Sequence, residues 1–232
     1  MSRRIQNLCF FILIISLLGL NSIKCAKTDD VVPINTNPSD STGNGGGIDS
    51  SGNTGGVTDS FAGFILNEVL YDPPGALAGD ANGDGVRDPN DDEFLEFVNH
   101  SDSSYNLSGY MIFDADRLAL GTPNHVFPEN TFINPEQAVV VFGGGTPSGS
   151  FGGAQVFVAS NQVLNLNNSG DFMTLTDSLG NVIIEFDITP LSDNPNESYT
   201  RSPDITGDFM QHNSVISGTL FSPGTNADGS SF

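Results

Sequence analysis

Oxygen-bearing side chains are concentrated between residues 80 and 93, at positions 80, 82, 84, 88 and 90–93. Calcium loops of twelve residues place their ligands at the odd-numbered positions from the first to the ninth and at the twelfth, with a glycine at the sixth. Here these positions hold Asp80, Asn82, Asp84, the backbone carbonyl of Val86, Asp88 and Asp91, with Gly85 as the glycine. The spacing therefore predicts a Ca²⁺ site, because Ca²⁺ binds about six to eight oxygens.

The loop departs from the EF-hand pattern in two ways. Position twelve is Asp91 where EF-hands use a bidentate glutamate, so either Asp91 binds with its shorter side chain, or Asp92 or Glu93 completes the shell. Pro73-Pro74-Gly75 upstream and a predicted strand downstream leave no room for flanking helices. The segment resembles the helix-less calcium loops of secreted bacterial proteins. The alternative is an acidic loop that binds nothing tightly.

Other chemistry-bearing residues do not form a catalytic pattern. Glu68, Glu93 and Glu96 could be an acid/base pair for glycoside hydrolysis, but outward-facing carboxylates on strands explain them better. The three histidines lack a zinc-binding spacing, and there is no Gly-x-Ser-x-Gly elbow or phosphate loop. We therefore predict a protein that is not an enzyme.

Charge excludes one class of partner. The 232 residues include 28 Asp and Glu against 7 Lys and Arg, a formal net charge of −21. Such a chain repels phosphate backbones, so we expect no nucleic-acid partner. The only cysteines are Cys9 and Cys25, and Cys9 lies in an apolar run, so no disulfide is expected.

The N-terminus has the pattern of a bacterial lipoprotein signal. Residues 1–24 hold Arg3 and Arg4 followed by an apolar run of about 13 residues, shorter than the roughly 20 that span a bilayer. Cys25 follows as the predicted lipidation site, although Lys24 replaces the small residue expected before it. Residues 25–60 are rich in Gly, Ser, Asn and Asp, which predicts a lipidated cysteine and a disordered tether. An ordinary secreted protein is the alternative.

The remaining chain, residues 61–232, is predicted to be a single all-β domain. Short apolar runs with a period near two alternate with turn residues, which is typical of a β-sandwich with about eight or nine short strands. The predicted strands are 64–70, 93–98, 110–113, 125–127, 138–142, 155–158, 171–176, 182–188 and 198–201. Residues 172–188 are expected to form a hairpin that turns at Gly180.

Six short segments of this domain resemble, in their order along the chain, the lamin tail domain, an immunoglobulin-like sandwich of nuclear lamins and many secreted bacterial proteins. The matching segments are Ile65–Val69, Asp92–Asn99, Asn106–Ile112, Asn134–Val141, Leu166–Asp171 and Ser198–Arg201. They cover roughly residues 62–210. The resemblance implies an immunoglobulin-like fold and no shared catalytic residues, which favours a binding or scaffold module.

Two functions follow from these patterns. The first is a lipid-anchored, calcium-binding lamin tail domain protein of the bacterial cell envelope. We expect it at the outer membrane, where surface exposure would let it serve adhesion, structure or binding of a protein or glycan. The second is a calcium-dependent secreted hydrolase acting on a glycan or phosphoester. A cleft with two carboxylates, or a carboxylate and a histidine, away from residues 80–93 would favour the hydrolase.

Overall fold

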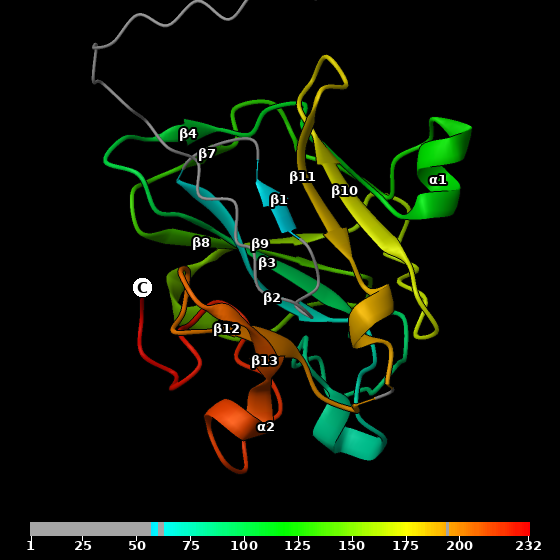
Figure 1. Ribbon diagram of the computed structural model, residues 1–232, viewed down its shortest axis with the longest axis vertical. Helices are drawn as coiled ribbons and strands as arrows, with labels where there is room; N and C mark the ends of the chain where they lie inside the picture. The colour runs from blue at the N-terminus through cyan, green and yellow to red at the C-terminus, as the bar shows by residue number, and fades with distance from the viewer. Residues whose placement is uncertain (1–56, 60–62, 194) are drawn as a thin grey trace, which may run out of the picture. The chain divides into compact units, whose positions relative to one another are not determined.

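Two β-sheets pack face to face in the described part of the chain (Figure 1). The computed structural model describes residues 57–59, 63–193 and 195–232. The first sheet has the strand order β1 (Val57–Asp59), β11 (Val182–Asp187), β10 (Phe172–Thr176), β5 (Met111–Phe113) and β6 (His125–Val126). The second has the order β13 (Asp208–Gln211), β12 (Tyr199–Ser202), β2 (Phe64–Leu70), β3 (Phe94–Asn99), β8 (Gln137–Phe142) and β9 (Gln155–Val158).

Short elements complete the fold. Strands β4 (Tyr105–Asn106) and β7 (Phe132–Ile133) form a separate pair. The helices are α1 (Ala115–Leu120) and α2 (His212–Val215), with 3-10 turns η1 (Ala76–Gly79), η2 (Phe151–Gly153) and η3 (Thr189–Leu191). Neither α-helix in the described ranges is long and apolar enough to cross a membrane. The predicted all-β sandwich is confirmed.

Each of the nine predicted strands corresponds to a strand of the structure, and four further strands were not predicted. The four are β1, β4, β7 and β13, none longer than four residues. No run of alternating apolar residues marks these four segments in the sequence. Strand β1 pairs with β11, so the first sheet includes residues 57–59. The signal segment, Cys25 and the tether as far as Gly56 lie outside the described residues.

Alternating side chains of the two sheets build the main core. Leu95 and Phe97 of β3 point toward the first sheet, where Leu175, Ile184 and Phe186 meet them, and all five are fully buried. This is the alternation that a strand with one face in the core requires. Burial of each such side chain stabilises the fold by about 1.5–3 kcal/mol.

The predicted hairpin of β10 and β11 is confirmed, with one local difference. Ile184, Phe186 and Ile188 are buried as the alternation predicts, but Val182 at the turn is 49% exposed. The register shifts between Leu175 and Thr176, beside the turn, so Val182 is not on the core face. Gly180 has a φ of 87°, in the left-handed region that the turn requires.

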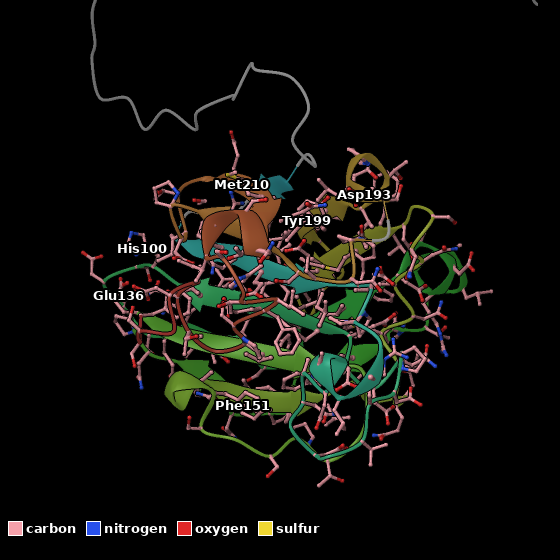
Figure 2. The ribbon with its side chains drawn as sticks, turned by 90° about the horizontal axis from the view of Figure 1, so that it is seen from below. His100, Glu136, Phe151, Asp193, Tyr199 and Met210 are labelled. Atoms are coloured by element: carbon pink, nitrogen blue, oxygen red, sulfur yellow. The ribbon has the colours of Figure 1, made fainter. Side chains whose placement is uncertain are left out.

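The second sheet is buried on its outer face as well. All six residues of β3 are buried, and Phe94 contacts Phe142 with 5.7 Å between ring centroids. Phe151 of η2 packs on Phe142 at 5.3 Å and is labelled near the lower edge of the domain in Figure 2. The same face carries Glu68 and Glu96, which are fully buried. The expectation that these glutamates face outward is wrong, because residues 220–224 of the C-terminal segment cover them.

Backbone and hydroxyl groups of the covering segment bind the two carboxylates. Glu68 accepts hydrogen bonds from the Ser222 backbone N–H at 2.9 Å and from the Ser222 hydroxyl at 2.7 Å. Glu96 accepts from the Gly224 N–H at 2.6 Å and from the Asn67 amide at 2.9 Å. His212 lies 2.9 Å from the Ser222 hydroxyl and completes the network. The C-terminal segment is thus held to the sheet through the glutamates.

Burial raises the pKa of Glu96 well above its usual value, and the neighbouring Glu68 raises it further. Glu68 of β2 is paired with Glu96 of β3, and both side chains are fully buried. If both were ionised, two negative charges would face each other away from water. Burial and the facing Glu68 carboxyl group therefore both favour the protonated form of Glu96 in the folded domain.

We predict that Glu96→Gln removes a pH dependence of stability. Because the folded-state pKa exceeds the unfolded-state value, the contribution of Glu96 is fully present below the unfolded-state pKa and is lost as pH rises through the folded-state pKa. Urea unfolding from about pH 5 to about pH 8 should show the native chain losing stability relative to the variant. The slope should approach ~1.4 kcal/mol per pH unit between the two pKa values. Exposed Glu129→Gln is the control. Parallel pH profiles of native and Glu96→Gln chains would contradict the prediction.

Candidate metal centre

The loop from Asp80 to Glu93 connects the 3-10 turn η1 to strand β3, without flanking α-helices. Its first half is wound by its own side chains. The Asp80 carboxylate accepts the Gly85 N–H, Asn82 accepts the Asp84 N–H, and Asp84 accepts the Val86 N–H, each at 2.9 Å. These bonds turn the chain around one centre. Gly85, with a φ of 90°, permits the tight turn at the predicted position.

One oxygen in this turn has no partner. Oδ2 of Asp80 binds the Gly85 N–H, whereas Oδ1 of the same carboxylate is buried and has no hydrogen-bond partner. A buried carboxylate oxygen without a donor costs several times the net value of a hydrogen bond. A cation beside Asp80 would compensate for this cost.

The glycine-rich segment after β8 packs against the loop. Thr146 donates its N–H to Asp84 at 3.1 Å, and Ser148 donates its N–H to the Asn82 carbonyl at 2.8 Å. A Cβ atom on Gly145 would clash with Asn82 Nδ2 and with Asp84 Oδ2, so only glycine allows this approach. This segment was not predicted to belong to the site, although three consecutive glycines after a strand indicate a close backbone contact.

The second half of the loop gathers like charges. Burial raises the pKa of Asp91, and the nearby carboxylates of Asp88 and Asp84 raise it further. The pKa of Asp84 is lowered, mainly by the backbone N–H of Thr146 and then by that of Val86. Asp91 therefore lies close enough to Asp88 and Asp84 to be repelled by both carboxylates.

Asp92 and Glu93 are engaged elsewhere. Fully buried Asp92 accepts the Asn82 N–H at 3.1 Å and the Asp88 N–H at 2.8 Å, so it ties the two halves of the loop together. Glu93 accepts the Leu166 N–H at 3.3 Å, and burial raises its pKa well above the usual value. Of the three residues considered for position twelve, Asp91 is therefore the one that remains near the carboxylates of Asp84 and Asp88.

Carboxylates alone do not make a metal site here. In the described ranges, no three His, Cys, Asp or Glu side chains form a group that could hold a metal ion. A Ca²⁺ shell in this loop would therefore need amide and carbonyl oxygens too, which Ca²⁺ accepts readily. Asn82 and the Val86 carbonyl are the residues of that kind at the predicted ligand positions. The donor set of the loop fits Ca²⁺ and does not fit a metal that prefers nitrogen or sulfur.

The histidines lie in three separate environments. His100 is 3.0 Å from Glu136 at the surface, and Figure 2 shows the two side by side at the edge of the domain. His125 is buried against Phe127 and Phe157, and burial lowers its pKa to about 4. His212 belongs to the network of Glu68 and Ser222 beneath the C-terminal segment. These placements fit packing and surface roles.

The fold defines an immunoglobulin-like β-sandwich with a wound acidic loop between β2 and β3. The chain belongs to the lamin tail domain family, whose family model matches residues 59–189, more than half of its length. No curated protein matches it in sequence. The predicted family is therefore confirmed. Membership suggests a non-enzymatic structural or binding module, since this immunoglobulin-like family is generally not catalytic.

We predict that Asp92→Ala destabilises the domain even in excess chelator. The change leaves the N–H groups of Asn82 and Asp88 without an acceptor, at a cost of about 1–3 kcal/mol for each buried group. Urea unfolding with chelator measures the loss, and exposed Asp102→Ala is the matched control. Equal stability of the Asp92→Ala and Asp102→Ala variants in chelator would show that Asp92 does not hold the loop together.

Proposed function

We propose that this chain is a lipid-anchored, calcium-binding module of the bacterial cell envelope, which presents its sandwich domain to a protein or glycan partner. The proposed ligands of Ca²⁺ are Asp80, Asn82, Asp84, the Val86 carbonyl, Asp88 and Asp91, whose carboxylates would have to draw together around the ion. Asp92 and the segment 143–148 position these ligands. The bound ion supplies the positive charge that the acidic loop lacks, and no reaction is required of it.

The single observation that carries the calcium proposal is the buried Oδ1 atom of Asp80. Asp80 is the first residue of the calcium pattern, and its other oxygen already binds the N–H of Gly85, the sixth. One oxygen therefore closes the turn while the other is left for a cation. A solvated acidic turn would instead expose both oxygens to water.

Calcium should stabilise the whole domain, because the loop continues directly into β3, a fully buried strand. An ion that binds only the folded loop adds about 2.7 kcal/mol at a hundredfold excess over Kd. For a domain of this size that corresponds to an increase in Tm of roughly 5–10 °C. Calorimetric titration and thermal unfolding, with calcium or chelator, measure both quantities. Mg²⁺ should substitute poorly, because it requires a smaller octahedral shell.

The variant for this test is Asp80→Ala/Asp84→Ala, which should bind no calcium and should melt at the same temperature with calcium and chelator. Asp102→Ala/Asp116→Ala removes the same charge from two exposed positions and should respond to calcium as the native chain does. A native chain that shows no binding heat at millimolar calcium and no change in Tm with chelator would rule out the calcium site.

The anchor proposal depends on Cys25, which stands at the end of the apolar N-terminal run. Several acyl chains on a processed N-terminal cysteine hold a protein on a membrane, whereas one chain binds only weakly. Residues 26–56, between Cys25 and β1, would then allow a reach of roughly 28–33 Å between the lipid and the domain.

We predict that Cys25→Ser releases the protein from the membrane fraction into the soluble fraction. Fractionation of bacteria that express each chain, together with labelling by a palmitate analogue, measures the effect. Cys9→Ser is the matched control and should remain with the membrane and keep its label. A Cys25→Ser chain that still takes up the label and sediments with membranes would overturn the assignment.

A further inference from the structure

A polar pocket of about 310 Å³ lies beside the calcium loop. This polar pocket is lined by residues 71–73, Arg87, Pro89, Asn90, Glu93 and residues 165–168. Its walls therefore come from the end of β2, from the loop itself and from the segment before β10. The volume is at the lower end of the range of about 300–1,000 Å³ for small-molecule sites, so a ligand of one ring would fit.

Hydrogen bonds fix the walls of the polar pocket as long as the loop is folded. Arg87 donates from Nε to the Pro74 carbonyl at 2.8 Å and from Nη2 to the Pro73 carbonyl at 2.6 Å. Asn168 donates its amide to Asp72 at 2.6 Å. One set of bonds connects the loop to the end of β2, and the other connects residues 165–168 to it. Side chains that are already ordered favour binding, because a ligand then loses little free energy to ordering them.

The polar pocket is lined by hydrogen-bond donors and acceptors, among them a cationic guanidinium group and two carboxyl groups. Two of the five N–H groups of Arg87 are engaged by the Pro73 and Pro74 carbonyls, which leaves three for a ligand. Asp72 and the 4% exposed Glu93 provide carboxyl oxygens, and each Asp72 oxygen already accepts one hydrogen bond and keeps room for another. Asn90 provides an amide that can donate and accept, whereas Asn167 provides its NH₂ group alone, because its oxygen accepts from the Ser169 N–H and hydroxyl.

This chemistry selects the class of ligand. An anion would face Asp72 and Glu93, a cation would face Arg87, and an apolar molecule would leave donors and acceptors unpaired. A neutral molecule with several hydroxyl groups can donate to the carboxyl oxygens and accept from the guanidinium at once. A single sugar ring satisfies these requirements and the volume.

We propose that the polar pocket binds one sugar residue of a neutral glycan, and that calcium in the loop is needed to hold Arg87, Pro89 and Asn90 in its wall. This inference rests on the proposed calcium site and gives the binding module its ligand class. Arg87, Pro89 and Asn90 lie within residues 80–91, so a loop that unwinds without calcium loses one wall of the pocket.

The test measures saturation transfer by NMR between the full chain and the methyl glycosides of glucose, galactose, mannose and N-acetylglucosamine, each at millimolar concentration. At least one glycoside should bind in calcium and not in chelator. Asn90→Ala and Arg87→Met should each weaken that binding by roughly tenfold or more, the effect of one lost hydrogen bond to a charged or amide group. Asn134→Ala, at an exposed position outside the pocket, is the control and should bind like the native chain.

Calorimetry with calcium alone, on each variant, separates this inference from the proposed function. If calcium binds and none of the four glycosides does, the sugar inference is wrong while the calcium site stands. If a glycoside binds equally well in chelator, or if Asn90→Ala and Arg87→Met bind it like the native chain, the inference is also wrong. If calcium itself does not bind, the proposed calcium site fails, and with it the calcium-dependent pocket.

Discussion

Buried carboxylates must find partners in a domain that has very few cations, and this constraint shapes the rest of the structure. The described ranges contain only three Lys or Arg residues, and two of them, Arg87 and Arg201, donate to backbone carbonyls. Backbone N–H, hydroxyl and amide groups therefore bind the buried acids. Such donors satisfy a carboxylate without a counter-ion, but only where loops bring the backbone to it.

Strand β3 connects the two places where this requirement is strongest. Its N-terminal end follows the acidic loop directly, and Glu96 at its middle is held by Gly224 of the C-terminal segment. In the C-terminal segment the donors satisfy the carboxylates, and burial raises the pKa of Glu96. In the loop, Oδ1 of Asp80 remains without a donor. The calcium proposal thus follows from the same constraint that explains the glutamate network.

Much of the fold could be predicted because the strands that build the core show a clear period of two. Nine of the described strands, the hairpin turn at Gly180 and the loop between β2 and β3 are all visible in the sequence. The covering of Glu68 and Glu96 was not predictable, since it depends on residues 220–224, far away in the chain. The roles of Asp92, Glu93 and the segment 143–148 likewise depend on which backbone N–H groups the fold brings near them.

The central claim is that an ion in the loop orders both the loop and the start of β3. Hydrogen–deuterium exchange of the full chain, with calcium and with chelator, tests it most directly, because it reports each backbone N–H group separately. We predict slower exchange in calcium for the N–H groups of residues 82–92, for those of residues 143–148 and for the first residues of β3. Equal exchange in these segments with calcium and with chelator would contradict the account.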